Sequence, residues 1–212
     1  MRHITRRALM GVAFAVGLTG GLAQAQQATI KIGVSISTTG QGAALGIPEK
    51  NTLELVAKEI GGAKIEVIQL DDAGDPTNAT TNARRLATED KVDILIGSAV
   101  TPATIAVSGV AFESAIPHFA LSPLPFQPGR EKWTFVLPQP VPLMAKGLWE
   151  NMKAKGVKTV GVIGFSDSWG DLWVKEFKAS AEPMGLTMVA DERYARADTS
   201  VAGQVLKLVA AR

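Results

Sequence analysis

Short apolar runs alternate with segments of helical spacing along most of this chain. The apolar runs predict strands at residues 29–37, 64–70, 92–96, 118–121, 133–137, 159–164 and 186–190. Helical spacing between them predicts helices over 48–60, 101–113 and 143–155, with others after Asp75-Pro76, after residue 170 and near Asp198 or Thr199. Because strands and helices alternate without a gap, we expect an α/β fold whose parallel sheets are covered on both faces.

Glycine and proline residues fix several of the expected element ends. A glycine-rich turn over 39–46 precedes the first helix, and Gly61-Gly62 is expected to end it. Asp75 followed by Pro76 is typical of a helix N-cap and first turn. The apolar positions expected to face the core are Leu53, Val56, Ala57 and Ile60 in the first helix and Ala79, Ala83, Leu86 and Ala87 in the second.

Two proline-rich segments divide the chain. Residues 122–129 hold three prolines within six residues and therefore cannot form regular structure. The second segment, 138–142, predicts a lobe boundary, with one lobe over 26–139 and another over 140–212. The second lobe has only two predicted strands, too few for an independent covered parallel sheet. We therefore expect the sequence to be a fragment or a truncated reading frame.

The first 25 residues have the pattern of a secretory signal peptide. Arginines at positions 2, 6 and 7 precede an apolar run over 8–22, and Ala-Gln-Ala at 23–25 is typical of a cleavage site. Export into the periplasm is the expected consequence. The pair Arg6-Arg7 leaves the twin-arginine route open beside the general one. A membrane anchor is disfavoured, because the run is broken by glycines and shorter than the ~20 apolar residues of a span.

Charge and composition then narrow the possible functions. Removal of residues 1–25 takes away three arginines and no acid, which changes the formal net charge from +2 to −1, so nucleic acid is not an expected partner. The chain has no cysteine, which excludes disulfides and thiolate metal sites. It has two histidines, and His3 lies in the signal, so His118 alone gives little support for a metal site or a Ser-His-Asp triad. No cofactor and no metal are expected.

Several motifs have a catalytic and a structural interpretation, and the structural one is favoured in each. Gly40-x-Gly42-x-x-x-Gly46 departs from the dinucleotide spacing and is better explained by a tight turn that lets a ligand or the other lobe approach the backbone. The acidic cluster Asp71, Asp72 and Asp75 lacks the ligand alternation of a calcium loop. His118 lies in a short apolar strand and is expected to be buried or at an edge. Residues 164–170 lack the G-x-S-x-G elbow of a hydrolase.

The segment from Val92 to Val107 is the strongest candidate for a binding site. It predicts a strand that ends at Gly97 and a helix with Thr101 as N-cap and Pro102 as first helical residue. Unpaired N–H groups of Ala103 and Thr104, the helix dipole and the Thr101 hydroxyl would then converge where parallel sheets bind ligands. A carboxylate is the group expected there, although the hydroxyl could instead serve only as a cap of its own helix.

Trp169 is the second candidate. It lies on the loop expected after the first strand of the second lobe, at the level of Thr101 in the first. An indole at that place could cover a ligand held by Thr101, and an ordinary packing role is equally consistent with the pattern.

Four stretches together give the chain a resemblance to a known family. They are IKIGVSISTTG, VIQLDDAGDPTNATTNARRL, DKVDILIGSAVTPATIAVSGVA and VGVIGFSDSWGD. From about Ile30 to Arg212 the chain resembles the leucine/isoleucine/valine-binding family of periplasmic solute-binding proteins, which feed ABC transporters. The resemblance implies the periplasmic-binding-protein type I fold, with doubly wound parallel sheets in two lobes that close on a ligand. It covers the first half to two-thirds of the family's usual length, so the second lobe would be incomplete.

The resemblance also implies a set of site residues. In the family, a Ser or Thr at the position of Thr101 binds the ligand carboxylate, the loop around Ser122 to Leu124 adds backbone groups, and an aromatic at the position of Trp169 closes over the ligand. Three departures stand out in this sequence. Phe126 replaces a hydroxyl residue that usually binds the ammonium group, Leu45 replaces an aromatic wall, and the acid common near Val141 is absent. The acid that neutralises the ammonium would lie beyond residue 212.

These departures keep the carboxylate end of the site and replace the groups that stabilise an ammonium by apolar ones. Burying a cation without a partner costs several kcal/mol. The sequence therefore favours a carboxylate with an apolar or aromatic body, with branched-chain amino acids as the other ligand class.

The function expected from these features is that of a monomeric, non-enzymatic solute-binding protein. It would capture its ligand between the lobes and deliver it to an ABC permease in the inner membrane. A ligand-sensing regulator on the same fold is the alternative, and a secreted α/β hydrolase is a weaker third one.

Overall fold

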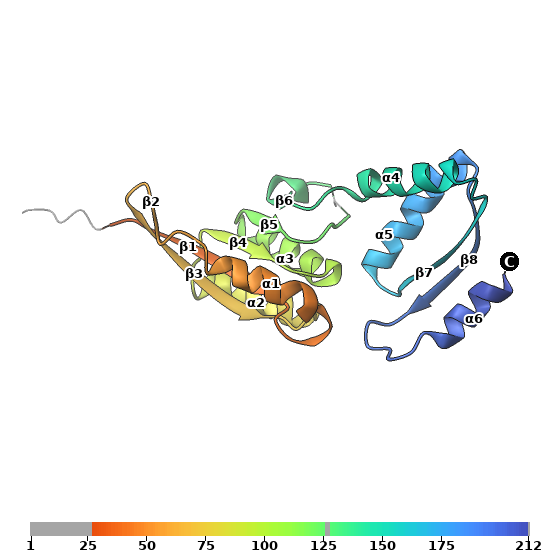
Figure 1. The fold of residues 1–212 in the computed structure, drawn as a ribbon. Coiled ribbons are helices and arrows are strands. Elements are labelled where there is room, and N and C mark those ends of the chain that lie inside the picture. The colour runs from red at the N-terminus through yellow and green to blue at the C-terminus, as the bar shows by residue number, and fades with distance from the viewer. Residues whose placement is uncertain (1–26, 126–127, 212) are drawn as a thin grey trace, which may run out of the picture.

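The computed structural model describes residues 27–125 and 128–211 and shows two separate sheets (Figure 1). The first sheet has six strands in the order β2-β3-β1-β4-β5-β6, and the second has two, β7 and β8. The predicted signal peptide and Phe126 lie outside the described residues. The strands are β1 Thr29–Ile36, β2 Glu59–Ile60, β3 Ala63–Asp71, β4 Ile94–Gly97, β5 His118–Ala120, β6 Thr134–Val136, β7 Thr159–Phe165 and β8 Thr187–Tyr194.

Six α-helices accompany the strands in the described part of the chain. They are α1 Ala43–Leu53, α2 Pro76–Thr88, α3 Thr101–Ser114, α4 Val141–Ala154, α5 Ser168–Glu176 and α6 Ala202–Ala210. No helix among the described residues is long and apolar enough to cross a membrane.

The first sheet is parallel except at one edge, and helices pack on both of its faces. Strand β1 lies between β3 and β4 and pairs in parallel with each, as the alternating pattern predicts. Helices α2 and α3 cover one face, where Leu86, Leu95 and Val107 are fully buried in one core cluster. Helix α1 lies over Val34 and Ile36 on the opposite face. We call this sheet and its helices the first lobe.

Helix α2 is formed as predicted. Asp75 is its N-cap, and its carboxylate accepts hydrogen bonds from the N–H groups of Thr77 at 2.8 Å and Asn78 at 2.9 Å. Ala79, Ala83 and Leu86 are fully buried, and Ala87 packs against the same cluster. The cap and the inner face depend on near neighbours in the chain, which is why the sequence is sufficient to predict them.

The prediction for the first helix is wrong at both ends. Helix α1 begins at Ala43, has Pro48 in its interior and ends at Leu53. Residues 59–64 form an antiparallel hairpin instead of a last helical turn, with Glu59 paired to Lys64. Gly61 and Gly62 both have positive φ, +57° and +82°, as a two-residue hairpin turn requires. The Gly-Gly pair therefore joins two strands and does not end a helix.

The second lobe is built around the parallel pair β7 and β8. Ala145, Trp149 and Phe177 are buried in its core, together with Ala181 and Leu186. The indole of Trp149 meets the ring of Phe177 edge-on, with centroids 5.3 Å apart. The last helix begins at Ala202, after a non-helical Val201, so the cap predicted near Asp198 or Thr199 is wrong by a few residues.

Candidate functional site

A pocket of about 300 Å³ lies between the two lobes. Leu45 of α1 and Thr101 of α3 reach it from the first lobe, and Phe165, Trp169 and Arg196 reach it from the second. The other residues that line it are Ala99, Val100, Leu121, Ser122, Pro123, Pro138 and Met144. Four predicted site residues, Leu45, Thr101, Ser122 and Trp169, are thus brought together, although they lie far apart in the sequence.

Thr101 is held in place by its own hydroxyl. The Oγ1 atom donates a hydrogen bond to the carbonyl oxygen of Pro123 at 2.9 Å and shares another with Ser122 Oγ at 2.8 Å. Val100, in an extended conformation, is the N-cap, so Thr101 is the first helical residue and the predicted cap is wrong by one position. The hydroxyl therefore links the start of α3 to the loop after β5 and does not cap its own helix.

The start of α3 offers fewer free donors than expected. The N–H of Thr104 donates to the carbonyl oxygen of Val100 at 2.9 Å, so the prediction that it is unpaired is wrong. Its side chain is also occupied, because Oγ1 donates to the Ser98 carbonyl oxygen at 2.8 Å. Ala103 and Thr104 are fully buried, and neither lines the pocket. The sequence could not show this, because a shift of one residue in the helix start changes which N–H groups are free.

Trp169 lies in the first turn of α5 and not on the loop where it was expected. Asp167 is the N-cap of that helix, and its Oδ1 accepts from the N–H groups of Trp169 at 2.9 Å and Gly170 at 3.2 Å. The indole meets Trp173 edge-on, with ring centroids 5.8 Å apart. The capped helix start therefore fixes the backbone from which the indole reaches the pocket.

Arg196 is the pocket residue that the sequence did not predict. Its Nε donates to Asp167 Oδ2 at 2.6 Å, and its guanidinium lies 4.0 Å from the centroid of the Phe165 ring. The side chain is 17% exposed. The available signal was an arginine shortly after the last predicted strand, at the carboxyl edge of a parallel sheet where ligands bind.

The two remaining predicted positions are not placed in this pocket. Leu124 lines a neighbouring one together with Pro123, Pro140 and Leu172. Phe126 lies outside the described residues, so its expected role stays a prediction.

The glycine-rich turn serves close packing within the first lobe. A Cβ on Gly46 would lie 2.0 Å from the Ser37 carbonyl oxygen, and one on Gly42 would lie 2.5 Å from the Ser37 Cβ. The residue that approaches these glycines is Ser37, directly after β1, and not the other lobe, which was one of the two expectations.

The acidic cluster is also structural. Asp72 is fully buried, and its carboxylate accepts hydrogen bonds from the hydroxyls of Ser35, Ser37 and Ser98. Asp75 caps α2. No group of three or more His, Cys, Asp or Glu side chains suited to a metal ion is found among residues 27–125 and 128–211.

His118 is fully buried, as expected. Its Nε2 contacts the carbonyl oxygen of Gly97, and its Nδ1 lies 3.4 Å from Thr134 Oγ1. Burial lowers the pKa of the imidazole to about 4, and the Gly97 contact opposes this only in part. His118 is therefore neutral at pH 7, and it does not line the interlobe pocket.

The family model for periplasmic binding proteins matches residues 29–212. The chain belongs to this family. An extracellular ligand-binding receptor from Rhodopseudomonas palustris HaA2 is similar in structure, with a TM-score of 0.85 and 62% identity over 86% of this chain and 51% of the receptor. The Leu/Ile/Val-binding protein homolog 8 of Brucella abortus (strain 2308) is 28% identical over 219 residues, which cover 95% of this chain and 54% of that protein. This periplasmic binding protein thus spans about half the length of these relatives.

The comparisons confirm the predicted fold. A solute-binding protein of an ABC transporter from Rhodopseudomonas palustris BisB5, in complex with 3,4-dihydroxybenzoic acid, has a TM-score of 0.78 and 23% identity over 86% of this chain and 52% of its own. At 23% identity the likeness concerns the fold alone, and the TM-score supports the type I architecture of doubly wound lobes.

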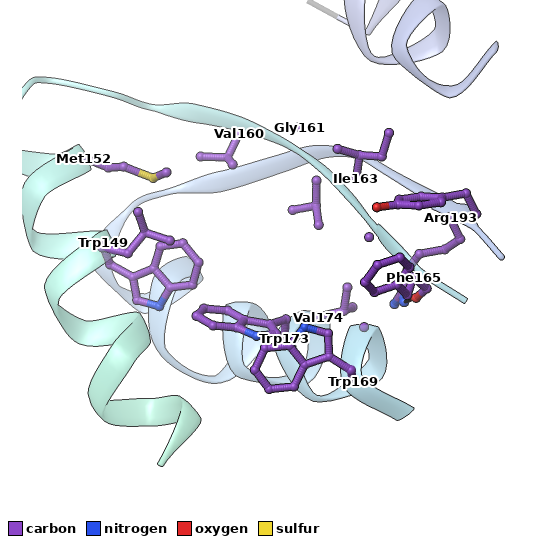
Figure 2. A pocket seen from close by; sticks show the side chains of 15 residues that line it. Trp149, Met152, Val160, Gly161, Ile163, Phe165, Trp169, Trp173, Val174 and Arg193 are labelled. Atoms are coloured by element: carbon purple, nitrogen blue, oxygen red, sulfur yellow. Dashed lines mark hydrogen bonds between the residues drawn. The ribbon is translucent and has the colours of Figure 1, made fainter. Parts of the chain in front are cut away.

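A second pocket of this periplasmic binding protein, of about 400 Å³, lies within the second lobe (Figure 2). Trp149, Trp169 and Trp173 lie along its helical side, and strand β7 forms the other side. Phe165 and Trp169 line both this pocket and the interlobe pocket. This lining is mostly apolar apart from Arg193 and Tyr194, whereas the interlobe pocket combines polar groups from both lobes.

Proposed function

We propose that this chain is the solute-capturing part of a binding protein for an ABC transporter. Its ligand is a small carboxylate with an apolar or aromatic body, which it holds in the interlobe pocket and does not chemically transform. The lobes meet between residues 139 and 140 in this proposal. Residues 1–25 direct export to the periplasm, and the protein acts as a monomer that delivers its ligand to an inner-membrane permease.

The main support for a carboxylate ligand is the lining of the interlobe pocket. Its described residues combine the hydroxyls of Thr101 and Ser122, one cation, Arg196, and an otherwise apolar wall, and they include no acidic residue. A carboxylate finds the positive charge of Arg196 there, and the Thr101 hydroxyl can donate to it in exchange for its bond to Pro123. The ammonium group of an amino acid finds no free carboxylate, because Asp167 is occupied by Arg196 and two backbone N–H groups. An unpaired buried ammonium costs several kcal/mol.

The relatives support the same ligand class and keep one alternative open. The Rhodopseudomonas palustris BisB5 protein holds 3,4-dihydroxybenzoic acid, an aromatic carboxylate. The Brucella relative carries a name that refers to leucine, isoleucine and valine. Branched-chain amino acids are therefore the competing ligands, and the acid that the resemblance assigns to their ammonium group would lie beyond residue 212.

Calorimetric titration decides between the two ligand classes. The protein is titrated with benzoate, 3,4-dihydroxybenzoate, L-leucine and, as a neutral control, glucose under identical conditions. We expect binding of the aromatic acids, weak or no binding of L-leucine and none of glucose. Tight binding of L-leucine without binding of either aromatic acid would overturn the proposed ligand class.

A further inference from the structure

We propose that Arg196 is the counter-ion of the ligand carboxylate and determines the preference of the pocket for acids over neutral analogues. This inference rests on the proposed function, because it assigns a residue to the carboxylate that the function requires. Neither the sequence patterns nor the family resemblance pointed to this position.

The first lobe supplies little charge to the pocket. The Thr101 hydroxyl donates to the Pro123 carbonyl oxygen, and the N–H of Thr104 is bound within its own helix. A helix start with its donors used in this way retains only a partial positive charge. The full positive charge in the described lining is that of the guanidinium of Arg196, which comes from the second lobe.

The guanidinium is held in a fixed position with donors to spare. Asp167 Oδ2 accepts from Nε at 2.6 Å, and the Phe165 ring lies against the guanidinium at 4.0 Å from its centroid. A guanidinium has five N–H donors, and the hydrogen bond to Asp167 uses the one on Nε. Among the described residues, the two terminal nitrogens of Arg196 donate no hydrogen bond. They form the fork that a carboxylate fits with two parallel hydrogen bonds.

Asp167 orients Arg196 without cancelling its whole effect. Its other oxygen accepts from two backbone N–H groups at the start of α5, and the positive end of that helix further stabilises the carboxylate. One residue therefore fixes both the indole of Trp169, through the helix cap, and the guanidinium of Arg196, through the ion pair. Asp167 is a positioning residue, and Arg196 is the group that touches the ligand.

The test compares an acid with its uncharged isostere. Benzoate and benzamide have nearly the same shape, so the ratio of their dissociation constants measures how much the negative charge contributes to affinity. This ratio is measured by calorimetry for the wild-type protein and for Arg196→Gln, Arg196→Lys and Lys146→Gln. Lys146 of α4 has a side chain that is 65% exposed, and its replacement removes one positive charge from the same lobe outside the pocket.

We expect Arg196→Gln to weaken benzoate binding roughly 10- to 100-fold, as for a lost hydrogen bond to a charged group, and to change benzamide binding less than about threefold. Arg196→Lys keeps the charge and loses the fork, so it is expected to retain part of the preference for the acid. Lys146→Gln is expected to leave the ratio unchanged.

Each other outcome overturns the proposal. Equal losses for benzoate and benzamide in Arg196→Gln would show that Arg196 only supports the fold, and no loss for either would remove it from the site. If Arg196→Gln does not fold, Arg196→Lys tests the proposal instead. It must weaken the binding of benzoate about three- to tenfold more than the binding of benzamide. Failure of the wild-type protein to bind any aromatic acid would overturn the proposed ligand class itself, which is a distinct result.

Discussion

The hydroxyl of Ser98 donates a hydrogen bond of 2.7 Å to the buried carboxylate of Asp72. This bond joins the end of β3 to the loop between β4 and α3, which leads into the interlobe pocket. Ser35 and Ser37 donate to the same carboxylate at 2.9 and 2.7 Å, so the ends of three strands meet at one acidic side chain. Asp72 thus holds the carboxyl edge of the sheet in register.

Replacement of Asp72 by alanine is expected to destabilise the protein by about 3 kcal/mol, because three buried hydroxyls lose their acceptor at once. Urea unfolding followed by tryptophan fluorescence measures this change. Asp75→Asn is the matched control, since asparagine is as good an N-cap as aspartate and should cost only a few tenths of a kcal/mol. A loss below about 1 kcal/mol for Asp72→Ala would contradict the role given to this carboxylate.

Gly46 is expected to tolerate no side chain. A Cβ there would lie 2.0 Å from the Ser37 carbonyl oxygen, a backbone atom that cannot turn away. Gly46→Ala should therefore cost about 3 kcal/mol or more. In Gly147→Ala, by contrast, the new methyl group meets nothing within 4 Å, and alanine in the interior of α4 should stabilise by about 0.5 to 1 kcal/mol. Thermal unfolding of the two variants should show shifts of opposite sign, and equal shifts would refute the packing argument.

His118 makes the stability of the protein depend on pH below neutrality. The folded state keeps the imidazole neutral down to a pKa of about 4, whereas the unfolded chain takes up the proton near the usual value of 6.5. The unfolded state therefore binds more protons between these values, and the stability that the neutral imidazole contributes is full above pH 6.5 and lost as pH falls toward 4. The loss amounts to at most about 3 kcal/mol.

NMR titration of the histidine ring protons checks this directly. The His118 signal should keep its neutral shift at pH 5.5. A chain that retains His3, outside the described residues, supplies an internal reference. Titration of His118 near pH 6.5 would contradict the burial argument.

Thr101→Ala is expected to weaken binding of benzoate by about 1.5 kcal/mol, the lower end for a hydrogen bond to a charged group. The low value follows from the structure, because the hydroxyl must give up its bond to Pro123 before it can donate to a ligand. Calorimetry on Thr101→Ala and on Thr101→Ser, which keeps the hydroxyl, measures the effect. Unchanged affinity in Thr101→Ala would remove Thr101 from the site.

Where near neighbours in the chain decide the structure, prediction from sequence was accurate. The cap at Asp75 and the apolar inner face of α2 both depend on residues within a few positions. The predictions went wrong where one pattern suits two structures. Gly61-Gly62 can end a helix or form the turn of a hairpin. Here β2 pairs with the start of β3, so the two glycines form a hairpin turn.

The alternation of strands and helices by itself determined the α/β class, the parallel sheet and the edge at which a ligand would bind, because parallel strands need helical crossovers and their carboxyl ends share one edge. Only the tertiary structure decided which side chains meet there. Thr101 and Arg196 are brought to one pocket by the packing of two lobes. A local pattern in the sequence cannot predict a contact between residues so far apart. The same holds for the donors at the start of α3, since their availability depends on where the helix begins and on which carbonyl oxygens the loop after β5 presents.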